Sequence, residues 1–194
     1  MRLGEIDCGD TLRSRLLIGM ISMVSGMRLP DAARVAFYHK DFLSGSLGRW
    51  TQATMRGPSA WSISERELTA AMVAQWNSCP FCVGAHGAIA AKQMPRRLVD
   101  EAIADYRTAD LPAGLVATLE FLEKLTLRPD ELTANDARQV FDAGVSAEGL
   151  SDAAAVAAIF NIITRYANAL DFAIPTTDEF DRAADMLLKR GYGS

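Results

Sequence analysis

The stretch that decides the fold, residues 62–92, reads SISERELTAAMVAQWNSCPFCVGAHGAIAAK. It holds two of the three cysteines and one of the two histidines of the chain. Ser62, followed three residues later by Glu65, forms a capping box, which predicts that a helix begins there. Pro80 suits the first turn of a second helix, because its missing N–H is not needed in that turn. The stretch is therefore predicted to be two helices that meet at Cys79.

Three reactive side chains of the second predicted helix share one face. Cys79, Cys82 and His86 follow one another at positions i, i+3 and i+7. Cys79 falls at the helix start, where free backbone N–H groups and the helix dipole favour a thiolate. Helix side chains lean toward the N-terminus, so His86 leans toward Cys82, four residues earlier. His86 is therefore predicted to serve Cys82 better than Cys79, which is about 10 Å of helix rise away.

One acidic residue of the first predicted helix lies among small side chains. Glu67 precedes Ala70, Ala71 and Ala74, and such small residues let another helix approach closely. A carboxylate at a close helix contact should face a partner. We expect that partner to be His86 on the second helix.

These residues together resemble a known family. Glu67, eleven intervening residues, CPFC at 79–82, three residues and His86 are similar to the signature of the alkylhydroperoxidase D-like proteins, within the carboxymuconolactone decarboxylase superfamily. The segment FNIITRYANAL at 160–170 resembles that family's downstream helix. The similarity is strongest over 62–95.

The resemblance implies a thiol-dependent peroxidase with an antioxidant role. Cys82 would attack the peroxide and become a sulfenic acid, and Cys79 would resolve it as a disulfide. His86 and Glu67 would relay the proton. The best-known members carry a second histidine where this chain has Phe81. The partners implied are a peroxide, a thiol or lipoyl-bearing reductant and further copies of the chain, as a dimer, trimer or hexamer; no bound cofactor or metal is expected.

Other interpretations of these residues stay open at this point. Cys79, Cys82 and His86 could bind zinc, although only three ligands are evident. The cysteines could also be inert core residues, with His86 a satisfied core histidine and Glu67 an ordinary helix residue. A decarboxylase acting on a lactone acid is the alternative within the superfamily, but its members characteristically lack the CxxC.

Composition indicates one ordinary globular domain over residues 1–194. The chain is 49% hydrophobic and 23% charged, with a net charge of −4. It has no basic stripe, which argues against a nucleic-acid partner. A CxxC without further cysteine pairs suits a cycling thiol pair in a reducing, cytoplasmic compartment. Residues 1–10 look like a loose lead, and Cys8 within them is predicted to be a bystander.

Two apolar runs predict contacts between copies of the chain. Residues 16–27 carry no charge, yet they are too short to span a bilayer and lack a clear signal-peptide cleavage site. We expect them to form a buried helix or a helix–helix contact, with no membrane partner. Residues 153–163 are apolar nearly all round, as in a core or interface helix. A small monomer does not easily hide both runs, so a homo-oligomer is predicted.

No alternating strand pattern of useful length is present, and no glycine-rich phosphate loop. The predicted fold is therefore all-α, a multi-helix bundle with the CxxC at the start of a central helix. His39 is expected to lie at a surface or a helix end. The tail RGYGS at 190–194 is expected to be frayed.

Overall fold

The computed structural model describes residues 1–38 and 45–192. Every regular element in these ranges is helical, which confirms the predicted fold class. His39 lies outside the described residues. The α-helices are α1 (Gly4–Cys8), α2 (Leu12–Ser25), α3 (Asp31–Tyr38), α4 (Gly48–Arg56), α5 (Ile63–Trp76), α6 (Pro80–Ala90), α7 (Arg96–Asp105), α8 (Ala113–Leu127), α9 (Ala134–Asp142), α10 (Ala147–Leu170) and α11 (Thr177–Arg190), with one 3₁₀ turn, η2 (Pro129–Glu131), after α8.

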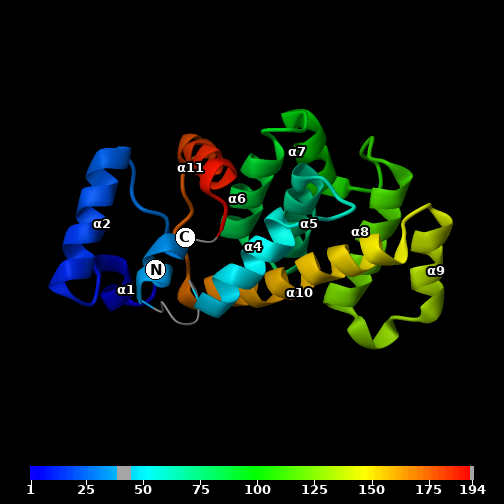
Figure 1. Ribbon diagram of the computed structural model, residues 1–194, viewed down its shortest axis with the longest axis horizontal. Coiled ribbons are helices and arrows are strands. Elements are labelled where there is room, and N and C mark those ends of the chain that lie inside the picture. Colours follow the sequence, from blue (N-terminus) through cyan, green and yellow to red (C-terminus); the bar gives the residue numbers. More distant parts are fainter. Residues whose placement is uncertain (39–44, 193–194) are drawn as a thin grey trace.

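The molecule is elongated, with α1 and α2 at one end and α9 at the other (Figure 1). Helix α5 lies in the middle and packs against α6, α8 and α10. Its apolar side chains enter three core clusters: Ala70 and Val73 face α10, Ala74 faces α6, and Leu68 belongs to the cluster with α7 and α8. An almost completely buried helix cannot show one apolar stripe, which explains why its sequence has little polar periodicity.

Helix α10 runs along the long axis of the molecule (Figure 1). Val156, Ile159 and Phe160 are buried against α5 and its neighbours, whereas Ile162 is exposed. Among the described residues, α10 is the one helix long and apolar enough to cross a membrane, a test that the core helix of a soluble protein also passes. Its packing against α5 and α8 is that of a core helix.

Helix α11 packs against α6, which brings the segment after it close to α5. A Cβ atom on Gly84 of α6 would lie 2.4 Å from Cε2 of Phe180, so only glycine permits this close approach. An ion pair between Arg96, at the start of α7, and Asp181 of α11 adds a contact at 2.8 Å. Both of its side chains are partly exposed, and such pairs contribute only about 0–1 kcal/mol. Apolar packing therefore supplies most of the stabilisation.

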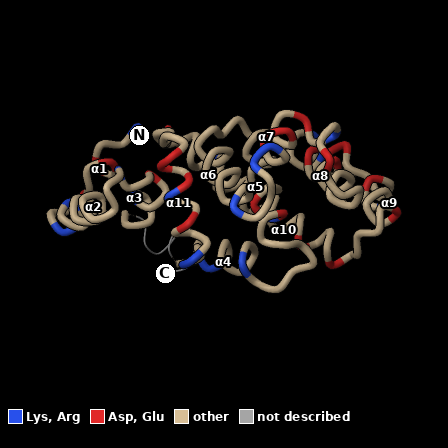
Figure 2. Tube along the Cα trace, turned by 90° about the horizontal axis from the view of Figure 1, so that it is seen from above, with Lys and Arg blue, Asp and Glu red and all other residues tan. Residues whose placement is uncertain are grey.

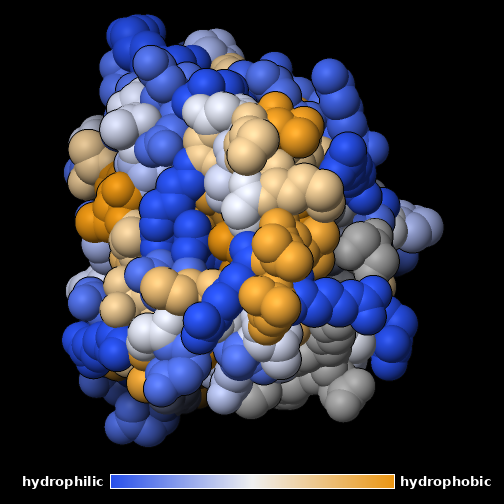
Figure 3. Space-filling view, turned by 90° about the vertical axis from the view of Figure 1, so that its left-hand side faces the viewer, coloured by the Kyte–Doolittle hydropathy of each residue, from blue (hydrophilic) through white to orange (hydrophobic). Residues whose placement is uncertain are grey.

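The prediction that residues 16–27 are buried is wrong for a single chain. Helix α2 leaves Leu16 67% exposed and Met23 83% exposed, and of its residues only Ile18 is buried. The helix stands at the end of the molecule, away from the core (Figure 1). A space-filling view of this end shows apolar side chains gathered on the surface among polar ones (Figure 3). The remaining expectation, a helix–helix contact, would need a second copy of the chain.

Both ends of the described chain are more ordered than predicted. Residues 1–10 are not a loose lead, because Gly4–Cys8 is helical and Ile6 is buried. The backbone N–H of Arg2 donates to the carbonyl of Leu170 at 2.8 Å, which ties this segment to α10. Tyr192 is not frayed either, since its half-buried side chain packs against the core cluster of α4, α5, α8 and α10. Acidic and basic residues are interspersed along the described trace, without one continuous basic run (Figure 2).

Candidate active site

Helix α5 begins as predicted. The Ser62 side chain accepts from the backbone N–H of Glu65 at 3.2 Å, and the Glu65 carboxylate accepts from the N–H of Ser62 at 2.8 Å. One turn further on, Glu67 is fully buried and points into the protein. Helices α5 and α6 form the most extensive helix pair of the described part. Ala74 of α5 is buried at this contact and Ala70 is buried against α10, so the small side chains allow close helix packing.

A turn fixed from both sides joins α5 to α6. Ser78 takes a left-handed conformation with φ of 52°, and the N–H of Cys79 donates to the carbonyl of Ala74 at 2.9 Å. Two asparagines of α10 hold the turn: Asn161 accepts from the Asn77 amide at 3.0 Å, and Asn168 donates to the Asn77 carbonyl at 2.9 Å. Helix α10 thereby places Cys79 at the end of the turn.

Cys79 caps the N-terminus of α6, and Pro80 occupies the first helical position. Both Cys79 and Cys82 are buried. A hydrogen bond from the Cys82 side chain lowers the pKa of Cys79 to about 7; burial opposes this effect, and the N–H groups of Cys82 and Phe81 add to it. The same hydrogen bond, burial and the charge on Cys79 raise the pKa of Cys82 well above its ordinary value. The first negative charge of the pair therefore resides on Cys79.

Glu67 and His86 meet across the α5–α6 contact. Oε2 of Glu67 lies 2.6 Å from Nδ1 of His86. Burial alone would raise the pKa of Glu67, but the hydrogen bond and charge of His86 and the charge of Arg56 outweigh it, so this pKa lies below its ordinary value. A carboxylate only accepts, so Nδ1 carries a proton, and in the neutral form of the imidazole Nε2 is the nitrogen that can accept one. This hydrogen-bond pattern makes Nε2 the basic atom of His86, one turn along α6 from Cys82.

Two residues of this network were missed by the sequence interpretation. Arg56, at the end of α4, pairs with Oε1 of Glu67 at 2.7 Å. The hydroxyl of Tyr192 donates to Oε1 and Oε2 of Glu67 at 2.8 and 3.0 Å. Neither residue lies in the stretch 62–92. No local motif distinguishes Arg56 from an ordinary arginine in a loop, or Tyr192 from an ordinary tyrosine near the end of the sequence. Only the tertiary packing of α4 against α5 and of α11 against α6 brings them to the site.

Comparisons with known proteins place this geometry in a structural class. No family model matches the chain, and no curated protein matches it. A solved structure of an uncharacterized peroxidase-related protein from Silicibacter sp. TM1040 is 24% identical, with a TM-score of 0.77 over 93% of both chains. Another, described as an alkylhydroperoxidase AhpD core, is a peroxidase-related protein from Ralstonia eutropha JMP134. It is 26% identical, with a TM-score of 0.70 over 87% of both chains. The chain has the AhpD-like fold.

The AhpD-like fold also includes a protein with another activity. The debrominase Bmp8 matches with a TM-score of 0.66 and 19% identity, over 90% of this chain and 93% of its own. A further structure of Bmp8 is a complex with 2,3,4-tribromopyrrole. At this identity the match concerns the fold alone, and one fold can support several chemistries.

Phe81, which stands where the best-known AhpD-like proteins have a second histidine, has an apolar role in this chain. The Phe81 ring packs edge-on against Phe172, with centroids 5.2 Å apart, and lies 6.0 Å from Phe180. It belongs to the core cluster that joins α6 to α11. Among the described residues, no three His, Cys, Asp or Glu side chains are grouped so that they could hold a metal ion. The zinc interpretation therefore lacks a suitable ligand arrangement.

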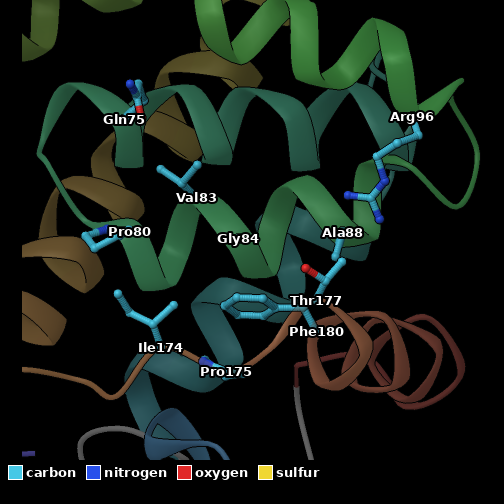
Figure 4. A pocket seen from close by; sticks show the side chains of 10 residues that line it. All are labelled: Gln75, Pro80, Val83, Gly84, Ala88, Arg96, Ile174, Pro175, Thr177 and Phe180. Carbon is cyan, nitrogen blue, oxygen red and sulfur yellow. The ribbon is translucent and has the colours of Figure 1, made fainter.

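A cavity of 410 Å³ lies on the other face of α6, toward α11 (Figure 4). Pro80, Val83 and Gly84 line it from α6, and Phe180 lines it from α11. Neither cysteine of the pair nor His86 lines this cavity. This cavity is thus separate from the hydrogen-bonded site.

Proposed function

We propose that the protein is a thiol-dependent peroxidase that cycles Cys79 and Cys82 between dithiol and disulfide. The observation that carries this proposal is the buried Glu67–His86 hydrogen bond, with His86 one turn along α6 from Cys82 and Cys79 at the start of the same helix with a lowered pKa. A lowered thiol pKa and a positioned base are what thiol chemistry requires. An inert structural pair has no need of either.

The proposed cycle starts at Cys82, whose raised pKa is the reason that it needs His86 as a base. Its proton passes to Nε2 of His86, and the thiolate attacks the peroxide oxygen, which breaks the O–O bond. Cys82 becomes a sulfenic acid, and the departing alkoxide takes the proton from His86. The Cys79 thiolate then attacks the Cys82 sulfur and displaces hydroxide, which is protonated to water. An external dithiol, of thiol or lipoyl type, returns two electrons and two protons to the disulfide.

Charge balance in the network supports this cycle. Arg56 pairs with Glu67 at 2.7 Å, so the buried carboxylate is neutralised even when His86 is uncharged. His86 is then available to accept a proton rather than being needed as a counter-ion. The decarboxylase interpretation has no use for a cysteine pair in which Cys79 has a lowered pKa, and it is the second choice.

We propose in addition that the protein assembles with copies of itself in a reducing, cytoplasmic environment. Helix α2 exposes an apolar stripe, which consists of Leu12, Leu16, Met20, Met23 and Val24. The stripe contains no charged residue, so two copies related by a two-fold axis could pair it with itself. Nucleic acid and membrane are not expected as partners.

A peroxide-consumption assay with a small dithiol reductant tests the enzymatic proposal. The wild-type protein should consume hydrogen peroxide or an alkyl hydroperoxide, and Cys82→Ser should abolish consumption. Cys8→Ser is the matched control, because Cys8 is exposed and lies outside the pair. Wild-type protein that consumes no peroxide with any dithiol would refute the proposal.

A further inference from the structure

The chain turns back toward α4 directly after α11. Gly191 has φ of 72°, and a Cβ atom there would lie 2.4 Å from the side-chain oxygen of Gln52. Its N–H donates to the carbonyl of Leu187 at 2.9 Å, and the N–H of Tyr192 donates to Gln52 at 2.6 Å. This turn requires glycine and directs the side chain of Tyr192 inward.

The Tyr192 side chain contacts every member of the Arg56–Glu67–His86 network. Its hydroxyl lies 2.8 and 3.0 Å from the two oxygens of Glu67 and 3.3 Å from Nδ1 of His86. Its ring is nearly parallel to the His86 ring, at 6.2 Å and 25°. The Arg56 guanidinium lies over the face of the same ring, 4.8 Å from the centroid. Burial and the Glu67 charge raise the pKa of Tyr192 well above its ordinary value, so the hydroxyl stays a neutral donor.

Arg56 could compete with His86 for the carboxylate. Its Nε and Nη2 atoms are buried and have no hydrogen-bond partner among the described residues, while Nη1 contacts Glu67. Arginine pairs with carboxylates preferentially through two parallel hydrogen bonds. A bidentate pair with Arg56 would draw Oε2 of Glu67 away from Nδ1 of His86. The Tyr192 hydroxyl occupies the carboxylate, and its ring face holds the guanidinium, so both contacts oppose that rearrangement.

We propose that Tyr192 is a positioning residue that keeps Glu67 bonded to His86 and thereby keeps Nε2 of His86 as the base. This inference about Tyr192 rests on the proposed function in one respect, namely that His86 acts as the base that activates a thiol. Without the hydroxyl, Arg56 is expected to capture both carboxylate oxygens. His86 would then lose its Nδ1 acceptor, and both tautomers of its ring would be populated.

The test compares Tyr192→Phe with a matched substitution. Tyr106→Phe is the control, because the Tyr106 hydroxyl also donates to a carboxylate, Glu123, at 2.8 Å, but lies elsewhere in the molecule. The first readout is the tautomer of His86 from the ¹⁵N shifts of its ring, which is tractable because the chain has only two histidines. The second is the pH profile of alkylation of Cys79 and Cys82 by iodoacetamide, located by mass spectrometry.

Wild type and Tyr106→Phe should show the Nδ1–H tautomer alone. Tyr192→Phe should show a mixture of tautomers, with alkylation of the pair slowed about tenfold at a given pH, the rate equivalent of ~1.4 kcal/mol. The titratable and charged groups around His86 are Glu67 from α5, Tyr192 after α11 and Arg56 from α4 on the far side of Glu67, with Cys82 one turn earlier on α6 itself.

Two results would overturn the proposal. One is a Tyr192→Phe protein with the same tautomer and alkylation profile as Tyr106→Phe. The other needs no variant, and so does not depend on folding of the mutant: a wild-type His86 that lacks the Nδ1–H tautomer. The two proposals can fail separately. If the wild-type protein consumes no peroxide while Tyr192→Phe shows both expected effects, the peroxidase function is refuted and the positioning role stays intact.

Discussion

Oε2 of Glu67 and Nδ1 of His86 lie 2.6 Å apart, although 19 residues separate them in the sequence. Both side chains are buried at the contact between α5 and α6. In a buried position this hydrogen bond is electrostatically stronger than it would be in water. It fixes which nitrogen of the imidazole can accept a proton, so it determines what His86 can do for a neighbouring thiol.

Removing either member of this pair should impair the reaction by a similar factor. Glu67→Gln and His86→Ala are each expected to slow peroxide consumption about 100-fold, at the lower end of what general-base catalysis contributes. The double variant should be little slower than the slower single variant, because the two residues act as a unit. Steady-state rates of the three variants provide the measurement.

Glu101→Gln on α7 is the control for this comparison, since Glu101 forms only a surface pair with Arg97. It should leave the rate unchanged. Effects of the two single variants that simply multiply in the double variant would show that Glu67 and His86 work independently.

The two cysteines should have different roles in one turnover. After a single equivalent of peroxide, Cys79→Ser should retain a sulfenic acid on Cys82 that dimedone traps, because the resolving thiol is missing. Cys82→Ser should give no such adduct. Mass spectrometry of the labelled peptide, 79–82 and its flanks, distinguishes the sites. An adduct on Cys79 in the Cys82→Ser protein would reverse the assignment, and the low pKa of Cys79 makes this the informative alternative.

The pKa of Cys79 predicts a dependence of stability on pH. In the folded protein this pKa is lowered from 9.0 to about 7. Between these two values the unfolded chain binds a proton that the folded protein does not, so stability should rise as the pH increases from about 7 toward 9 and fall again as the pH decreases. Thermal melting of the reduced protein across this window should show the rise.

Cys79→Ser should remove this rise, whereas Cys8→Ser should retain it, because Cys8 is exposed and separate from the pair. The ultraviolet absorbance of thiolates gives an independent titration. A melting temperature that does not respond to pH in this window would show that the charge is not held on Cys79.

The apolar stripe of α2 should be covered in solution. Multi-angle light scattering at micromolar concentration is expected to find more than one copy per particle, and Leu16→Glu with Met20→Glu should shift the protein toward the monomer by burying charge at the contact. Phe141→Glu on α9 is the control, since Phe141 is also exposed but lies at the opposite end of the molecule. A wild-type monomer, or equal dissociation by Phe141→Glu, would contradict the prediction.

The local parts of the site could be predicted from the sequence because their causes are local. The capping box at Ser62 and Glu65 and the proline at the start of α6 depend on neighbours in the chain. The meeting of Glu67 with His86 followed from helix geometry and from small residues that permit close packing. Each of these features is set by residues within one helix pair.

The remaining parts depend on contacts that no local pattern encodes. Arg56 and Tyr192 reach Glu67 from α4 and from the segment after α11, so their positions follow from tertiary packing alone. The exposure of α2 was mispredicted for a related reason. An uncharged run such as 16–27 is equally compatible with a core and with a surface between copies, and only the arrangement of the helices separates the two.

Tyr192 follows His86 by 106 residues in the chain. It is therefore the last member of the Arg56–Glu67–His86–Tyr192 network to leave the ribosome. During synthesis α5 and α6 can pair early, because their contacts are local in sequence, whereas the contacts of Tyr192 close a long loop. A nascent chain would therefore carry its cysteine pair for some time before the carboxylate is fully organised. The carboxylate of Glu67 thus acquires its full set of donors, from Arg56, His86 and Tyr192, only once α4, α6 and the segment after α11 have all packed around it.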